Sequence, residues 1–154
     1  MSNKLIMKQL FEMQVPKIKV IKIDAEKQLV YQIEIDNTLQ AKYDAIGNDC
    51  RLIEVGARFR HNNPLRSYDD VMYVDEEALL KFDSIDAQHE IGIFKLLLPM
   101  NQVESGRYDP YKIIHKFVGN AIIVGTSNDG DSESANVSIE KVREKILGFY
   151  KSNK

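Results

Sequence analysis

An uninterrupted apolar run, Ala121-Ile122-Ile123-Val124, constrains the fold of this 154-residue chain more than any other stretch. Four apolar residues in succession cannot alternate between a buried and an exposed face, so both faces of a strand at 121–124 must be covered. The polar residues 127–136 follow; they include no large apolar side chain and are typical of a loop. We therefore expect a central β-strand at 121–124.

The segment before this run predicts a short helix. Asp109 is a suitable N-cap residue, and Pro110 fits the first helical position, where its missing N–H has no cost. Gly119 would end the helix in a left-handed conformation. One face of this helix would carry Ile113, Ile114 and Phe117.

The pattern of apolar residues predicts further strands separated by short helices. A helix at 38–46 would have Asn37 as its N-cap and Gly47 as its end. One or two helical turns are expected at 76–80, and residues 83–90 are expected to be irregular. Strands are expected at 17–23, 29–35, 50–55, 71–74 and 91–98, with an amphipathic helix before them at 1–15.

The last helix has the clearest start signal in the chain. Ser138 is a good N-cap, and Val137 and Val142 occupy the positions of a hydrophobic staple. The buried face would consist of Ile139, Val142, Ile146 and Phe149. Runs of strands with short interspersed helices predict one α+β domain over 1–154, with a mainly antiparallel sheet and the C-terminal helix packed on one face.

Composition excludes several classes of function. The formal net charge is −2, so the chain as a whole does not attract nucleic acid or anionic lipid. Residues 69–90 carry eight acidic side chains against Lys81 alone. A single cysteine, Cys50, excludes an internal disulfide. With no apolar run of membrane-spanning length and no signal-peptide core at the start, we expect a cytoplasmic protein.

A basic stretch at 58–66 is the strongest candidate for a binding surface. Its side chains suit a carboxylate or a phosphate, because guanidinium groups bind both in bidentate fashion. The alternative is a solvated edge that pairs with the acidic stretch at 69–77. The candidate binding residues are Arg58, Arg60, His61, Asn62 and Arg66.

No catalytic set or cofactor site is evident in the sequence. The loop at 125–132 has glycines spaced as in a phosphate-binding loop, but Asp131 stands where that loop needs lysine. Glu133 comes too soon to complete a calcium loop, and the three histidines are too far apart in sequence for a zinc site. We therefore expect no cofactor and no metal, and a non-enzymatic protein.

Several segments together resemble a known group of sequences. IEIDNTLQAKYDAIG and LIEV are followed by DDVMYVDEEALLK and then by FVGNAIIVGTSNDGD before the last helix. This order, over about residues 29–150, resembles a domain-of-unknown-function family of small proteins from phages, plasmids and accessory regions of gut bacteria. The resemblance implies a mobile-element origin and carries no catalytic residues.

The functional expectation follows from the resemblance, the missing catalytic sets and the segregated charges. We expect a binding or accessory protein of phage or mobile-element origin that acts on a host or phage protein. One alternative is a small-ligand or nucleotide-phosphate binder that uses the loop at 58–66. A nucleic-acid-binding regulator is a further alternative, which the net charge and the lack of a recognition motif disfavour.

Overall fold

The computed structural model describes residue 3, residues 15–99 and residues 112–152. Two expectations lie outside these residues, namely the helix at 1–15 and the N-terminal turn of the helix that Asp109 and Pro110 would begin. The other expected helices and strands lie within the described residues.

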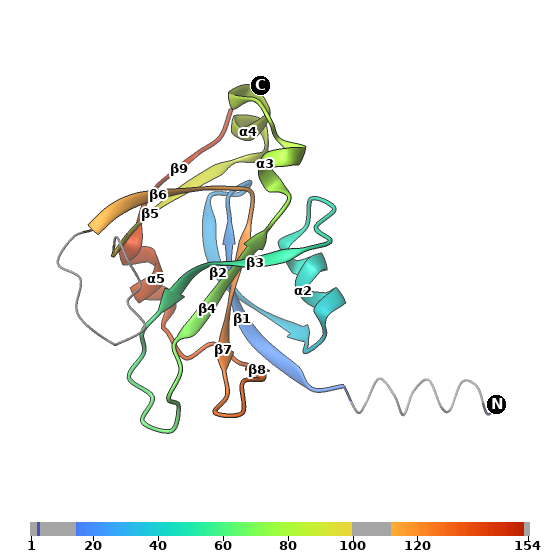
Figure 1. Ribbon diagram of the computed structural model, residues 1–154, viewed down its shortest axis with the longest axis vertical. Coiled ribbons are helices and arrows are strands. Elements are labelled where there is room, and N and C mark those ends of the chain that lie inside the picture. Colours follow the sequence, from blue (N-terminus) through green and yellow to red (C-terminus); the bar gives the residue numbers. More distant parts are fainter. Residues whose placement is uncertain (1–2, 4–14, 100–111, 153–154) are drawn as a thin grey trace.

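Two antiparallel sheets contain the strands (Figure 1). The larger sheet has the order β2-β1-β7-β4-β3, and β8 pairs with β7. Its strands are β1 (Lys17–Asp24), β2 (Leu29–Asp36), β3 (Ile53–Phe59), β4 (Asp70–Asp75), β7 (Ala121–Thr126) and β8 (Ser132–Glu133). The smaller sheet has the order β6-β5-β9, formed by β5 (Ile93–Pro99), β6 (Lys112–Val118) and β9 (Ile146–Tyr150). The helices are α2 (Leu39–Ile46), α3 (Ala78–Lys81), α4 (Ile85–Ile91) and α5 (Ile139–Lys145).

The expected central strand is confirmed. β7 lies between β1 and β4 and pairs with both. Residues 121–124 are at most 1% exposed, because their side chains alternate between two buried faces. Ala121 and Ile123 belong to the core on the side of the smaller sheet, whereas Ile122 and Val124 belong to the cluster under α2.

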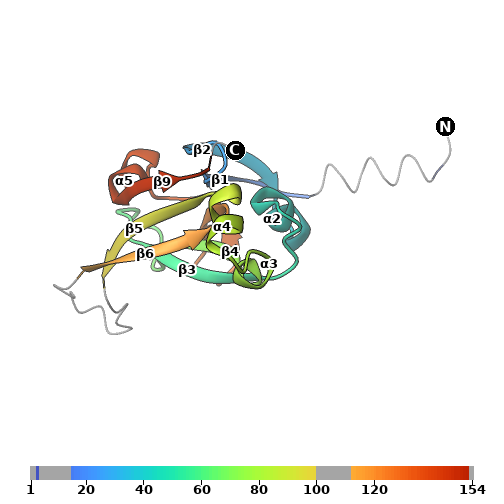
Figure 2. The ribbon, with the colours of Figure 1, turned by 90° about the horizontal axis from the view of Figure 1, so that it is seen from above.

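The larger sheet is thus the middle of three layers, with α2 on one face and the smaller sheet with α5 on the other (Figure 2). Val142 of α5 is fully buried in the same cluster as Phe94 of β5 and Ile23 of β1. The expected α+β class, the mainly antiparallel sheet and the packed C-terminal helix are therefore confirmed. In β1 the adjacent residues Val20 and Ile21 are both buried, because they face the two different cores on either side of the sheet. The pairing of β1 with β2 is regular.

The helix α2 begins one residue later than predicted. The N-cap is Thr38, whose Oγ1 accepts a hydrogen bond from the N–H of Ala41 at 3.1 Å. Asn37 instead donates its side-chain N–H to the carbonyl oxygen of Ser132, at 2.9 Å, and so connects this turn to β8. Gly47 ends the helix at φ 77°, as expected.

The helix predicted before the central strand is wrong where the structure describes it. Residues 112–118 form the strand β6, which pairs with the full length of β5. Phe117 is the cross-strand partner of Phe94, and the two rings stack with their centroids 5.1 Å apart. Gly119 does have a positive φ, of 85°, but it forms the turn from β6 to β7.

The last helix is shorter than predicted. α5 ends at Lys145, and Ile146 and Phe149 belong to β9, where they pair with Leu96 and Phe94 of β5. Both side chains still pack against the core, as predicted, but they belong to a strand and not to a helix. The backbone groups on this edge of β5 pair with β9. They would have no such partner if residues 146–149 continued the helix.

Two further segments differ from the prediction. Residues 85–91 form α4 rather than irregular chain, since Ser84 caps the helix by accepting the N–H of Ala87. The strand β3 continues through a bulge between Val55 and Ala57 and ends at Phe59, so Arg58 lies in a strand and not in a loop. The connection between β3 and β4 is correspondingly shorter than expected.

Candidate functional site

The five predicted binding residues do not converge on one surface. Arg58 is exposed and pairs with Val71 in the sheet, opposite the face that holds the buried Phe59. Arg60 and Asn62 are exposed beyond the end of β3. The other two members, His61 and Arg66, are engaged within the protein.

The side chain of His61 is only 5% exposed. Its Nδ1 accepts the N–H of Asn63 at 3.1 Å, so the ring proton belongs on Nε2, which donates to the carbonyl oxygen of Tyr68 at 2.7 Å. Asp70 Oδ1 lies 3.9 Å from the same Nε2. With both ring nitrogens used internally, His61 shapes the loop and does not face a ligand.

Arg66 is held by an ion pair across the molecule. Its Nε donates to Glu133 of β8, and one Nη donates to the carbonyl oxygen of Leu65 at 3.1 Å. Asn63 donates to the side-chain oxygen of Asn136 at 2.8 Å. The basic loop is thus hydrogen-bonded to the loop at 127–136 and to β8. Its contacts are not limited to the acidic stretch at 69–77.

Asp70 is the buried centre of this network. Its carboxylate is 0% exposed and accepts the backbone N–H groups of Asn136 and Val137, both at 2.7 Å. The side chain of Asn136 donates to the other oxygen at 3.0 Å. These bonds satisfy a carboxylate that burial would otherwise penalise strongly, and they position the residues that lead into α5.

One cation of α5, Lys141, lies next to the exposed part of the basic stretch. The ammonium of Lys141 donates to the carbonyl oxygen of Arg60 at 2.8 Å. The pKa of Lys145 is lowered, mainly by burial and to a smaller extent by repulsion from Lys112 and Lys141. Arg60 therefore has one neighbour of like charge, Lys141, that is distant from it in the sequence.

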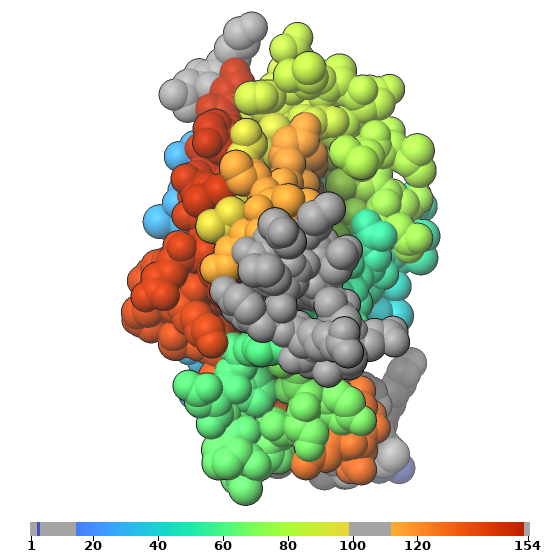
Figure 3. All heavy atoms as spheres, turned by 60° about the vertical axis from the view of Figure 1, so that its left-hand side comes forward, coloured from blue at the N-terminus to red at the C-terminus, as the bar shows by residue number. Residues whose placement is uncertain are grey.

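Three of the four most exposed large apolar residues in the described part of the chain lie on α3 and α4. Leu79 is 64% exposed, Leu80 79% and Ile85 71%, all within seven positions. This part of the chain forms a knob beside β6 at the upper right of Figure 3. We call Leu79, Leu80, Asp83, Ile85, Asp86 and Glu90 the acidic apolar surface, because its three carboxylate residues are exposed as well.

The structure explains why the leucines of α3 point outward. Ala78 is buried against Ile93 and Val118 on the smaller sheet, and that contact fixes the inner side of the helix. Lys81 also turns inward, where its ammonium bonds Asp75 at 2.8 Å and the carbonyl oxygen of Asp49 at 2.7 Å. A four-residue helix with these two anchors leaves residues 79 and 80 on its outer side.

α4 is anchored at its C-terminal end. Gly92 has φ 110°, and a Cβ there would lie 2.6 Å from the carbonyl oxygen of Ala25. Its own carbonyl accepts the N–H of Gly119 at 2.9 Å. Nearby, the buried Asn120 accepts from the N–H of Ala25 and donates to the carbonyl of Ile46, at 2.9 and 3.0 Å. These contacts hold the end of α4, and with it this part of the acidic apolar surface, in one position on the protein.

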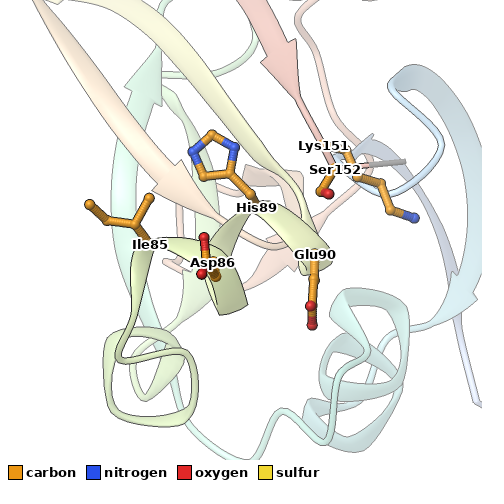
Figure 4. Close-up of a pocket in the computed structure, with 6 residues that line it drawn as sticks. All are labelled: Ile85, Asp86, His89, Glu90, Lys151 and Ser152. Atoms are coloured by element: carbon orange, nitrogen blue, oxygen red, sulfur yellow. The ribbon is translucent and has the colours of Figure 1, made fainter. Parts of the chain in front are cut away.

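A hollow of about 460 Å³ adjoins this surface (Figure 4). The C-terminal segment closes one side, where the N–H of Ser152 donates to the carbonyl of His89 at 2.7 Å. In Figure 4 Asp86 and Glu90 project from α4, while the ammonium of Lys151 points away from this helix. The lining residues are Ile85, Asp86, His89, Glu90, Lys151 and Ser152.

Metal-ligating residue types do not cluster in the described residues. The described part of the chain contains no group of three or more His, Cys, Asp or Glu side chains placed to hold a metal ion. Cys50 is buried, and this burial, with Asp75 nearby, raises the pKa of its thiol, which keeps the reactive thiolate scarce. In the same part of the chain no helix is long and apolar enough to cross a membrane.

Comparisons with protein-family models, with curated proteins and with solved structures give no match. The family resemblance of the sequence therefore stays a prediction. The sequence contained one signal for the acidic apolar surface, namely two adjacent leucines in the acidic stretch at 69–90. Helical periodicity could not show that they are exposed, because α3 spans little more than one turn.

Proposed function

We propose that this protein is a non-enzymatic binding protein that docks another protein through the acidic apolar surface. The observation that carries the proposal is the exposure of Leu79, Leu80 and Ile85, between 64% and 79%, within seven positions. Single exposed apolar residues are ordinary on protein surfaces, whereas grouped ones mark interaction sites. Covering each of these side chains would contribute about 1–2 kcal/mol to association.

The rest of the structure supports binding rather than chemistry. His61 and Arg66 are occupied by internal bonds, so the loop at 58–66 offers no assembled phosphate site. α3 and α4 are anchored at Lys81 and Gly92, which favours docking because little ordering is needed on association. We further propose, from the resemblance alone, that the partner is a host or phage protein of a mobile-element system.

The proposal is tested with Leu79→Ser combined with Leu80→Ser in the full chain. Affinity capture from cells, followed by mass spectrometry, should recover at least one protein with the wild type that the double variant recovers about tenfold less. The free energy of unfolding should change by less than about 1 kcal/mol, since both side chains are exposed.

The matched control is Leu65→Ser, which removes a leucine that is 71% exposed on the connection between β3 and β4. It should capture the same proteins at wild-type yield. Equal yields from the wild type, the control and the double variant would contradict the proposed function.

A further inference from the structure

We infer that the partner docked on the acidic apolar surface presents a basic amphipathic segment, with apolar side chains against Leu79, Leu80 and Ile85 and cationic side chains toward Asp86 and Glu90. This inference rests on the proposed function and names the chemistry of its partner. Charge complementarity is the argument, because the apolar side chains alone would accept many partners.

The carboxylates of this region exceed the cations available to neutralise them. Five acidic side chains lie between positions 76 and 90, namely Glu76, Glu77, Asp83, Asp86 and Glu90. Lys81 is committed to Asp75, and Lys151 lies 3.8 Å from Glu26. Lys116 bonds the neutral Gln88 at 3.2 Å. Among the described residues, Asp83, Asp86 and Glu90 form no ion pair.

The arrangement of these charges suits a helix or an extended segment with regularly spaced cations. Asp86 and Glu90 are four residues apart on α4, so their carboxylates lie one turn from each other. Both line the hollow, as does Ile85. In Figure 4 the ammonium of Lys151 is turned away from α4, and the charge that lies near it is that of Glu26, at 3.8 Å.

Other occupants fit less well. A nucleic acid would bring its phosphates against these carboxylates and be repelled. A second copy of the chain would have to bring its own basic residues to the surface, and this case is distinguished in the experiment below. A basic segment of another protein satisfies both the apolar and the charged part of the surface.

The test uses two fluorescein-labelled probes, a helical amphipathic peptide of leucine and lysine and the same peptide with every lysine replaced by glutamate. Titration with the full chain, followed by fluorescence anisotropy, should show binding of the lysine peptide and not of the glutamate peptide. Asp86→Asn with Glu90→Gln should weaken binding of the lysine peptide about tenfold, since two facing charges are lost.

The matched control is Asp129→Asn with Asp131→Asn, which removes two exposed carboxylates from a loop outside the surface. It should bind the lysine peptide as the wild type does. Equal weakening by both double variants would overturn the inference, because only net charge would then matter. Binding of the glutamate peptide at equal strength would overturn it as well.

The outcomes separate this inference from the proposed function. If Leu79→Ser with Leu80→Ser loses its partner in capture while Asp86→Asn with Glu90→Gln retains it, the charged part of the inference is wrong and the function stands. If the wild type dimerises in sedimentation velocity and Asp86→Asn with Glu90→Gln is monomeric, the occupant is a second copy and the inference is wrong.

Discussion

At the scale of single residues, burial decides which of the candidate side chains are structural. His61 and Arg60 are neighbours in the same basic stretch, yet only the imidazole is enclosed. A sequence pattern shows charge and spacing but not exposure. Both residues therefore count as candidate binding residues from the sequence alone. A role of the exposed Arg58 and Arg60 in partner binding stays a prediction, which a capture experiment would test separately.

The contrast between these neighbours gives a stability prediction. His61→Ala should lower the free energy of unfolding by about 1–3 kcal/mol, because the N–H of Asn63 and the carbonyl of Tyr68 lose their partner. Arg60→Ala should change it by less than about 1 kcal/mol, as exposed charges usually do. Chemical denaturation of both variants is the measurement. Equal effects would show that the bonds of His61 do not hold the loop.

At the scale of elements, the sequence predicts those helices, strands and helix ends that are specified by neighbouring residues. The alternation in β2, the glycine that ends α2 and the serine that caps α5 each act within a few residues, and each is present in the structure. β6 and β9 could not be predicted in the same way. Both are edge strands that pair with β5, and local sequence signals do not record this pairing; for β9 the partner is also distant in sequence.

The end of α4 gives a prediction at this scale. Gly92→Ala should destabilise the protein by more than about 2 kcal/mol, because φ is 110° and the new Cβ would lie 2.6 Å from the carbonyl oxygen of Ala25. Gly130→Ala is the matched control. It has a similar positive φ of 88° but open space around it, and should cost only about 1 kcal/mol. Urea denaturation should separate the two variants, and equal midpoints would show that the contact with Ala25 is relaxed.

At the scale of the whole molecule, the two sheets and α5 share one core. Ile23 of β1, Phe94 of β5 and Val142 of α5 belong to a single cluster, so neither sheet can expose its inner face without disrupting the other. The sequence predicted the antiparallel sheet and its centre. It did not predict that the strands divide into two sheets, because that division depends on which apolar faces meet after folding.

The shared core predicts that unfolding is cooperative across both sheets. Amides at 121–124 of β7 and at 94–98 of β5 should exchange with solvent hydrogen only through global unfolding, and therefore with the same free energy. Amides at 127–131, which form the exposed turn before β8, should exchange faster by orders of magnitude. Native-state hydrogen exchange followed by NMR would measure each group. Exchange at 121–124 as fast as at 127–131 would contradict the central strand, and a clearly lower free energy at 94–98 would show that the smaller sheet opens by itself.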